Sequence, residues 1–369
     1  MLLQGPRPRK ESKTMEIVGI GDLLIPEQYI KKGFHNFEQA GHTVRTVQWK
    51  LKDYEELQNI NLKVETGGSE VFEPPQEVLD AIEGADVVIT QFCPVTKRVL
   101  DHCRNLKAVG VLRGGYENVN VRHATEKGVL VLNTPGRNAN AVADFAVGMM
   151  LCECRNIAKA HRNLKEGRWV RDYDNAATVP DLPDKTVGIV GFGAIGRKVA
   201  QRLRGFEMNI LAYDPFVKEG PDYVKLVPLE ELMKESRFVT LHARLTPETE
   251  HMIDGKMLAL MRPDAYLINT ARSGLVDEKA LYEALKAKRI AGAALDVFDV
   301  EPPSADYPLV ALPNVTVTPH LAGGTMDAFT NSPKLLALEM IHLLEGKSSR
   351  YIVNKDIFDS AVKKFQAAN

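Results

Sequence analysis

The chain has 369 residues, of which 44% are hydrophobic and 26% are charged. These are ordinary proportions for a globular protein, and the length suggests two domains with substantial cores. The chain carries 47 Lys and Arg against 48 Asp and Glu, so its net charge is −1. That balance gives no electrostatic basis for binding nucleic acid or an anionic membrane, and no apolar run reaches the roughly 18 residues that span a bilayer.

The N-terminal segment, residues 1–14, is polar and basic and lacks the apolar stretch of a signal peptide. We therefore expect a disordered tail there, with Met15 as an alternative start. The four cysteines show neither C-x-x-C nor zinc-site spacing, which favours reduced thiols over a metal site in a cytoplasmic protein. These cysteines are Cys93, Cys103, Cys152 and Cys154.

From residue 16 the sequence alternates short apolar runs with polar or helical stretches. This alternation is typical of a parallel sheet covered by helices. The predicted strands lie at residues 16–20, 87–90, 108–112 and 129–132. Apolar residues at helical spacing then predict one long helix over residues 138–162, and Pro135-Gly136 before it can act as a hinge.

A second series begins at Lys185, after a polar, proline-containing segment (171–185) that we interpret as a surface loop. Its predicted strands lie at residues 187–190, 210–213, 238–241, 265–269, 293–297 and 315–318. Helical stretches such as 196–204 and 278–287 separate most of them, which predicts a second, larger doubly wound sheet. A further helix is expected at about 332–344, and residues 358–369 are expected to form a C-terminal tail.

A G-x-G-x-x-G motif lies between the first strand and the first helix of this second series. Gly191 permits a tight turn, Gly193 lets the backbone approach a pyrophosphate, and Gly196 lets the helix pack closely on the strand. The predicted helix that this motif opens offers free N–H groups and the positive end of its dipole to the phosphates, with Ala194 and Ile195 of the motif among the expected cofactor-binding residues.

Asp214 ends the next predicted strand, 23 residues after Gly191. That spacing is near the roughly 20 residues typical of the acid that binds the ribose. A carboxylate there accepts hydrogen bonds from the ribose hydroxyls and repels a 2′-phosphate, so the motif favours NAD over NADP. A structural glycine turn in another Rossmann-like protein is the alternative.

Three later strands are followed by Arg272, Glu301 and His320. Because ligands bind at the carboxyl ends of parallel strands, we expect these side chains near the dinucleotide. Arg272 suits the grip on a carboxylate and the polarisation of a carbonyl. His320 suits general acid/base catalysis, and Glu301 can orient its ring. Together they predict hydride transfer between a nicotinamide and a 2-keto or 2-hydroxy acid.

Several stretches resemble the NAD-dependent D-2-hydroxyacid dehydrogenase family, in particular its phosphoglycerate dehydrogenase and glyoxylate/hydroxypyruvate reductase members. The resemblance extends over roughly residues 15 to 355. The matching stretches are 133–136, 141–144, 188–196, 213–215, 269–278, 294–298 with 301–302, and 318–320 with 323–324.

This resemblance implies catalytic roles for Arg272, Glu301 and His320 in interconverting a 2-keto acid and a D-2-hydroxy acid. It also implies further contacts to NAD, from His242, Ala243, Thr246, Thr270, Ala271, Asp296 and Gly323, with Arg272 and His320 also beside the cofactor.

The family fold further implies two Rossmann-like domains with the active site in a cleft between them. Residues 15–135 plus 325–357 would form a discontinuous substrate domain, and residues 136–324 the NAD-binding domain. Hinges would lie near Pro135-Gly136 and Gly323-Gly324, and the protein would be a homodimer or homotetramer.

The loop at residues 111–118 resembles the family loop whose backbone N–H groups meet the substrate carboxylate, through Gly114 and Gly115. Arg113 stands where the family usually has a smaller or neutral residue. It either adds a second contact, to a phosphate or a polyhydroxy acid, or turns to solvent or pairs with an acid such as Glu117. Arg244 replaces a family proline, which makes the cofactor edge more cationic and leaves strict NAD selectivity open.

Two other functions fit the same fold. One is a regulatory NAD(H) sensor related to transcriptional corepressors, and the complete trio argues against it. The other is formate oxidation by an enzyme that resembles the formate dehydrogenases. That family has Gln at the position of Glu301, so Glu301 argues against this function.

Overall fold

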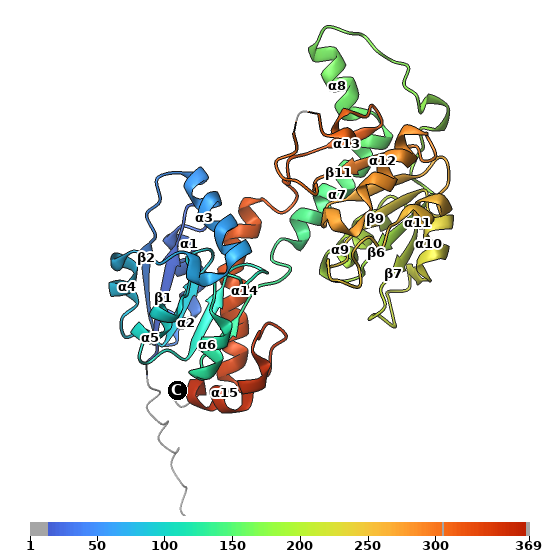
Figure 1. Cartoon of the computed structure of the whole chain (residues 1–369). Helices are drawn as coiled ribbons and strands as arrows, with labels where there is room; N and C mark the ends of the chain where they lie inside the picture. The colour runs from blue at the N-terminus through green and yellow to red at the C-terminus, as the bar shows by residue number, and fades with distance from the viewer. Residues whose placement is uncertain (1–13, 305, 367–369) are drawn as a thin grey trace, which may run out of the picture. The chain divides into compact units, whose positions relative to one another are not determined.

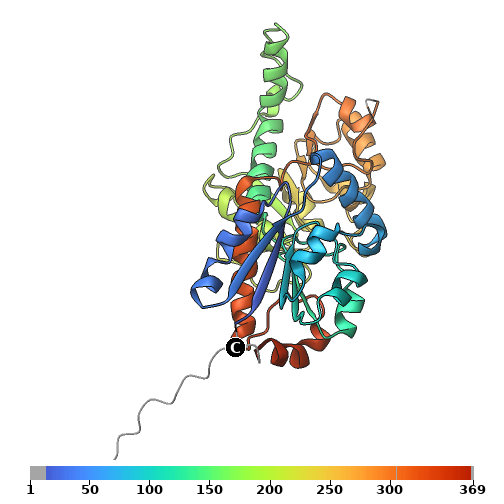
Figure 2. The ribbon, with the colours of Figure 1, turned by 90° about the vertical axis from the view of Figure 1, so that its left-hand side faces the viewer.

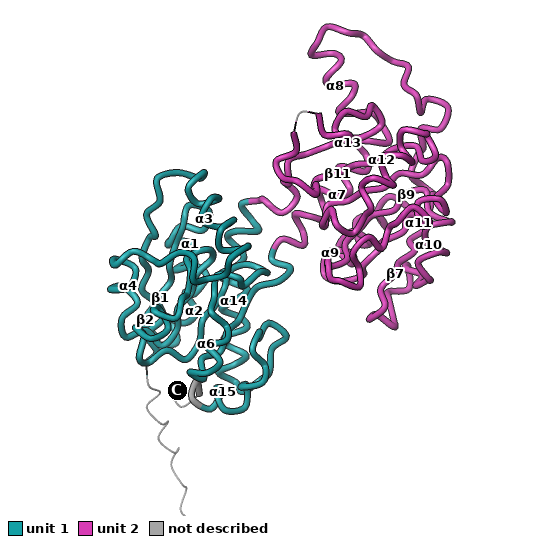
Figure 3. Tube along the Cα trace, viewed as in Figure 1, with its two compact units in different colours: residues 1–137, 326–369 teal, residues 138–325 magenta. Residues whose placement is uncertain are grey.

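The computed structural model describes residues 14–304 and 306–366, so nearly all of the expected N-terminal tail lies outside the described residues. The chain divides into two compact units (Figure 3). Unit 1 contains the described residues up to Arg137 and those from Met326 onward, and unit 2 is Asn138–Thr325. Each unit is built on one parallel sheet with helices on its faces, which confirms the predicted α/β class.

The five-stranded sheet of unit 1 has the order β2-β1-β3-β4-β5, with all neighbours parallel. Four of its strands confirm the sequence prediction: β1 (Glu16–Gly21), β3 (Val87–Thr90), β4 (Ala108–Val111) and β5 (Leu130–Leu132). The edge strand β2 (Thr43–Gln48) was not predicted, because only one of its residues, Val44, is buried. A half-exposed edge strand lacks the continuous apolar run of a central parallel strand.

The helices of unit 1 come from both parts of the chain. They are α1 (Glu27–Gly33), α2 (His35–Gln39), α3 (Tyr54–Gly67), α4 (Gln76–Ile82), α5 (Lys97–His102), α6 (Val121–Glu126), α14 (Met326–Leu344) and α15 (Phe358–Gln366), with short 3-10 turns at Ser69–Val71 and Lys355–Ile357. Helix α14 runs along the sheet in both views (Figures 1 and 2). A Cβ atom at Gly110 of β4 would lie 2.4 Å from Cδ2 of Leu336, so helix and strand are in intimate contact.

The expectation of a C-terminal tail is wrong for residues 358–366, which form α15. Its Ala361 and Val362 are buried, and the helix packs against α14. The apolar residues Phe358, Ala361, Val362 and Phe365 recur at i, i+3, i+4 and i+7, so the sequence did carry a helical pattern that the expectation of a tail overlooked.

The seven-stranded parallel sheet of unit 2 has the order β12-β11-β10-β9-β6-β7-β8. The six predicted strands are all present: β6 (Thr186–Val190), β7 (Asn209–Tyr213), β9 (Phe238–Leu241), β10 (Tyr266–Asn269), β11 (Gly292–Leu295) and β12 (Val315–Val317). The strand that was missed, β8 (Val224–Leu226), is a three-residue edge strand.

Helices cover both faces of this second sheet. They are α7 (Ala139–Cys154), α8 (Ile157–Lys165), α9 (Ala194–Arg204), α10 (Leu229–Glu235), α11 (Gly255–Leu260), α12 (Glu278–Lys286) and α13 (Pro308–Ala311), with 3-10 turns at Ala176–Thr178 and Ser273–Leu275. Buried faces of α7 and α9 share one core with β6, β7 and β10.

The prediction of one long helix over residues 138–162 is wrong. The chain breaks between α7 and α8 at Asn156, whose φ of 58° is in the left-handed region. Asn enters that region more readily than most residues, and its Nδ2 here donates to Asn175 Oδ1 at 2.8 Å. Helix α8 stands away from the sheet of unit 2 (Figure 1) and buries none of its residues.

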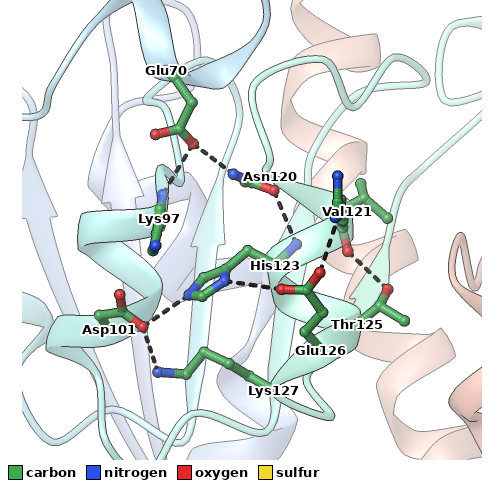
Figure 4. A network of polar contacts seen from close by, with 10 residues as sticks. Glu70, Lys97, Asp101, Asn120, Val121, His123, Thr125, Glu126 and Lys127 are labelled. Atoms are coloured by element: carbon green, nitrogen blue, oxygen red, sulfur yellow. Dashed lines mark hydrogen bonds and ion pairs between the residues drawn. The ribbon is translucent and has the colours of Figure 1, made fainter.

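A polar network connects α5 and α6 on unit 1 (Figure 4). The His123 ring contacts Asp101 Oδ1 at 2.8 Å through Nε2 and Glu126 Oε2 at 3.5 Å through Nδ1. Lys127 Nζ lies 2.9 Å from the same Asp101 oxygen. Hydrogen bonds from His123 and Lys127 lower the pKa of Asp101 to about 2, so this carboxylate stays ionised at any physiological pH.

All four cysteines are free thiols, and three of them are buried. Within the described residues, no helix combines the length and the apolar character that crossing a membrane requires.

Candidate active site

The carboxyl ends of the unit 2 strands share one edge of the sheet, because all neighbouring strands are parallel. The order of the strands in the sheet therefore gives the order, along this edge, of the residues that follow them. Across the sheet they are His320 after β12, Glu301 after β11, Arg272 after β10, His242 after β9, the glycine turn after β6 and Asp214 after β7. The strand order reverses between β6 and β9, in the middle of this row, where ligands of such sheets bind.

Each glycine of the turn after β6 meets the constraint expected of it. Gly191 has a φ of +91°, and a Cβ there would lie 2.4 Å from the backbone nitrogen of Ala243. A Cβ on Gly196 would lie 2.1 Å from the carbonyl oxygen of Gly191. A Cβ on Gly193 would meet nothing within 4 Å, so the space above this residue is open.

Helix α9 begins at Ala194, directly after Gly193, and no side chain caps it. The first N–H groups of a helix, here those of Ala194, Ile195 and Gly196, have no intrahelical acceptor and carry the positive end of its dipole. Open space in front of uncapped N–H groups fits the pyrophosphate of a dinucleotide.

The Asp214 carboxylate is fixed beside the glycine turn. Its Oδ2 accepts the N–H of Phe192 at 2.9 Å, and its Oδ1 accepts the N–H of Phe216 at 2.9 Å. A carboxylate has about four acceptor sites, so two remain for ribose hydroxyls. The arrangement fits the predicted ribose-binding role.

The loop after β9 presents a neutral histidine. Thr240 Oγ1 and His242 Nε2 lie 2.9 Å apart, and Nδ1 is enclosed with no partner in the described part of the chain. Burial lowers the pKa of His242 to about 3, so its ring carries no charge near neutral pH. In the same loop the N–H of Thr246 donates to Thr249 Oγ1 at 2.8 Å, and Arg244 is exposed.

The loop after β10 is held by a buried asparagine. Asn269 Oδ1 accepts the N–H of Ala271 at 3.0 Å, and its Nδ2 donates to the carbonyl of Arg272 at 2.9 Å. Arg272 is exposed, its Nη1 donates to the carbonyl of Ala271 at 2.7 Å, and no carboxylate among the described residues pairs with it. Thr270 Oγ1 is buried without a hydrogen-bond partner in that same part of the chain. Arg272 thus has no ion-pair partner, and the Thr270 hydroxyl is left without a hydrogen bond, among the described residues.

The structure brings Glu301 and His320 together. His320 Nδ1 lies 2.8 Å from Glu301 Oε2, and Glu301 Oε1 accepts the N–H of Phe298 at 3.0 Å. The side chains are 46% and 37% exposed, so the pair faces accessible space. A carboxylate on Nδ1 favours the tautomer or charge state with a proton there and leaves Nε2 for a substrate.

A buried acid holds the backbone that carries His320. His320 itself has a φ of +52°, and its N–H donates to the carbonyl of Asp296 at 2.9 Å. The Asp296 carboxylate accepts the Thr318 hydroxyl at 2.6 Å and the N–H groups of Leu321 and Ala322 at 2.8 Å. The sequence did not indicate this anchoring role, because it depends on a loop 22 to 26 residues away.

Gly323 follows in the same loop and packs against the start of α7. A Cβ at this position would lie 2.5 Å from Asn138 Nδ2. The glycine therefore allows the close contact between the loop and the N-cap residue of α7.

In unit 1, Arg113 is occupied by partners within its own unit. Its guanidinium donates to Asn61 Oδ1 at 2.7 Å, to Glu65 Oε1 at 2.5 Å and to Glu117 Oε2 at 3.2 Å. The alternative in which Arg113 pairs with Glu117 is therefore confirmed. The partners on α3 could not be foreseen, since 48 residues separate Glu65 from Arg113.

The loop after Arg113 offers unoccupied donors. Within the described residues, the N–H groups of Gly114 and Gly115 donate no hydrogen bond. A Cβ at Gly115 would lie 2.3 Å from Glu117 Oε2, so the Arg113–Glu117 pair covers this glycine. Free N–H groups in a glycine loop suit a carboxylate.

Asp22, a residue that sequence reasoning missed, follows β1 at the corresponding edge of unit 1. It is 1% exposed and accepts the N–H groups of Leu24 and Ile25 at 2.8 and 2.9 Å. Burial raises the pKa of Asp22 to about 6, and the charge of Arg137 opposes the rise. Its position at the end of a strand, like that of Asp214, was the signal that could have found it.

Comparisons with known proteins agree with this geometry. Residues 147–322 match the family model described as D-isomer specific 2-hydroxyacid dehydrogenase, NAD binding domain. The chain is 41% identical over 284 residues to the D-3-phosphoglycerate dehydrogenase of Methanocaldococcus jannaschii, which covers 76% of this chain and 53% of that relative. It thus spans about half the length of that relative.

A second relative matches over most of its own length. The glyoxylate reductase of Korarchaeum cryptofilum is 37% identical over 300 residues, 79% of this chain and 90% of the relative. Among solved structures, the NAD-complexed D-isomer specific 2-hydroxyacid dehydrogenase of Lactobacillus delbrueckii ssp. bulgaricus shares the fold. Its TM-score is 0.72 at 24% identity, over 92% of this chain and 100% of that one.

If Asp214 binds the ribose, removing its charge should weaken the binding of NADH and reduce the preference for NADH over NADPH. Asp214→Asn is expected to raise the Kd for NADH about tenfold, because a hydrogen bond to a charged group is worth roughly 1.5–3 kcal/mol. Fluorescence titration with NADH and NADPH measures both changes. Asp222→Asn, at an exposed acid nearby, is the control, and an unchanged NADH/NADPH ratio in Asp214→Asn would contradict the assignment.

Proposed function

The chain belongs to the D-isomer specific 2-hydroxyacid dehydrogenase family, and from this membership we propose that it interconverts a 2-keto acid and a D-2-hydroxy acid with NAD. The observation that carries the proposal is the His320–Glu301 pair, 2.8 Å apart, at the sheet edge that also presents the glycine turn and an unpaired Arg272. A general acid and a carboxylate-binding cation are the groups that this reaction requires.

In the reducing direction, Arg272 binds the substrate carboxylate and polarises the carbonyl. A dinucleotide held by the glycine turn and Asp214 would supply the hydride for the carbonyl carbon. His320 donates the proton from Nε2 to the carbonyl oxygen, while Glu301 holds Nδ1 and stabilises the charged ring. In the oxidising direction His320 takes the proton back from the hydroxyl. The open side of Gly193 and the buried, unpartnered Thr270 hydroxyl support a bound dinucleotide.

We assign unit 1 to substrate binding and unit 2 to the cofactor. The unoccupied N–H groups of Gly114 and Gly115 support a carboxylate site in unit 1. The four free thiols support a reducing compartment such as the cytoplasm.

NADH oxidation with a panel of 2-keto acids tests the proposal. The panel includes glyoxylate, hydroxypyruvate, phosphohydroxypyruvate and pyruvate. Turnover of a keto acid supports a dehydrogenase, and NADH binding without turnover favours the NAD(H) sensor. Reduction of NAD⁺ by formate, measured in a separate assay, with no keto acid turned over favours the formate dehydrogenase.

His320→Ala is expected to lower kcat by about 10²–10⁴, because the proton donor is lost. The Kd for NADH is expected to change little. Stopped-flow reduction of the best keto acid and a fluorescence titration measure the two quantities. His35→Ala, at an exposed histidine on α2, is the control, and turnover at the wild-type rate by His320→Ala would exclude the assigned role.

Arg113 is expected to hold the Gly114–Gly115 loop and not to select a phosphate, because two carboxylates already neutralise it. Arg113→Ala should lower kcat/KM for hydroxypyruvate and phosphohydroxypyruvate equally, by about tenfold or more, since misplaced binding groups are costly. Arg122→Ala, at an arginine on α6 whose side chain is 91% exposed, is the control. A loss confined to the phosphorylated substrate would restore the second-anion hypothesis.

We propose that the chain forms a homodimer or homotetramer through α8 and the segment after it. Ile157 and Leu164 of α8 and Trp169 after it are 54%, 59% and 79% exposed, and large exposed apolar groups close together in the sequence favour a contact surface. The double variant Leu164→Ser, Trp169→Ser is expected to sediment as a smaller species than the wild type. Leu62→Ser, at a leucine of unit 1 that is 61% exposed, should not, and a monomeric wild type would refute the proposal.

A further inference from the structure

The loop that carries Glu301 connects β11 to α13. A second carboxylate, that of Glu278, forms hydrogen bonds to this loop. Glu278 is the first residue of α12. Its Oε1 accepts the N–H of Asp299 at 3.1 Å, and its Oε2 accepts the hydroxyl of Tyr307. One side chain therefore contacts the loop on both sides of Glu301.

An aromatic contact joins these two sides. The rings of Phe298 and Tyr307 meet edge to face, with centroids 5.8 Å apart. The N–H of Phe298 in turn donates to Glu301 Oε1 at 3.0 Å. A continuous set of contacts thus runs from Glu278 through the loop to Glu301, whose other oxygen meets His320.

Glu278 stands on a rigid support. Asp277 caps α12 by accepting the N–H of Ala280 at 2.9 Å, and Leu281 and Leu285 bury the helix in the core. The positive end of a helix favours a carboxylate in its first turn. Burial raises the pKa of Glu278, although the hydroxyl of Tyr307 opposes that rise, and burial with the adjacent carboxylate raises the pKa of Tyr307. The phenol therefore remains a hydrogen-bond donor.

We propose that Glu278 is a positioning residue that, through Asp299 and Tyr307, sets Glu301 against His320. The inference rests on the proposed function, since it presumes that the Glu301–His320 pair works in catalysis. Without Glu278 the loop loses an anchor on each side, and the Glu301 carboxylate has no fixed distance from the imidazole. Its support of the protonated ring is then weaker, because that support depends on close approach of opposite charges.

The pH profile of kcat/KM for keto acid reduction, measured with saturating NADH, tests this role. In the wild type the rate falls at high pH, where the general acid loses its proton. In Glu301→Gln the fall is expected at lower pH, since the carboxylate that lies 2.8 Å from Nδ1 of His320 is gone. Glu278→Ala should shift the fall in the same direction and lower kcat/KM about tenfold. Tyr307→Phe, which removes only the hydroxyl, should give a smaller shift in that direction.

The double variant Glu278→Ala, Glu301→Gln separates positioning from general destabilisation. If Glu278 acts through Glu301, the double variant should be no slower than Glu301→Gln alone, because coupled residues are not additive. Glu283→Ala, at an exposed acid on the same helix, is the control and should behave like the wild type. Partial rescue in Glu278→Gln, which keeps one acceptor oxygen, would support the proposal further.

The outcomes are distinguishable. The positioning role would be overturned if the pH profile shifts in Glu301→Gln but in neither Glu278→Ala nor Tyr307→Phe. It would also be overturned if the losses in kcat/KM of the two single variants multiply in the double variant. Either result would leave the proposed function intact. An unshifted profile in Glu301→Gln itself would remove the basis of both. If Glu278→Ala fails to fold, Tyr307→Phe alone decides between them.

Discussion

Parallel pairing throughout the unit 2 sheet is the constraint on which the site depends. Because every strand points the same way, each one delivers the residues that follow it to the same edge. Strands lie roughly 4.8 Å apart, so Arg272, Glu301 and His320 come from three adjacent strands without any one of them needing a long connection. The reversal between β6 and β9 then opens the edge at the glycine turn.

Most of the fold could be predicted from the sequence, and the failures have distinct physical causes. Central strands such as β3 and β9 are buried on both faces, so an uninterrupted apolar run indicates them. The two missed strands, β2 and β8, are edge strands. Elements of this kind are stabilised by their neighbours more than by their own pattern. The break at Asn156 depends on one left-handed residue, which periodicity does not reveal.

In the candidate site, too, some residues could be predicted from the sequence and others could not. Residues at the ends of strands could be placed from sequence because strand direction places them, as with Asp214 and His320. The side chains that fix them could not. Asp296 holds the His320 loop and Glu278 holds the Glu301 loop through hydrogen bonds to distant backbone groups. Such partners follow from the folded path of the chain, whereas residue type alone does not indicate them.

Unit 2 is inserted between two parts of unit 1, and this has a consequence for synthesis. The apolar face formed by Ile17, Val87 and Leu130 shares one core with Leu336 and Met340 of α14. A ribosome completes all of unit 2 before it makes that helix. The first-made sheet therefore emerges with an uncovered face, and the nascent chain stays exposed to aggregation until α14 has been translated.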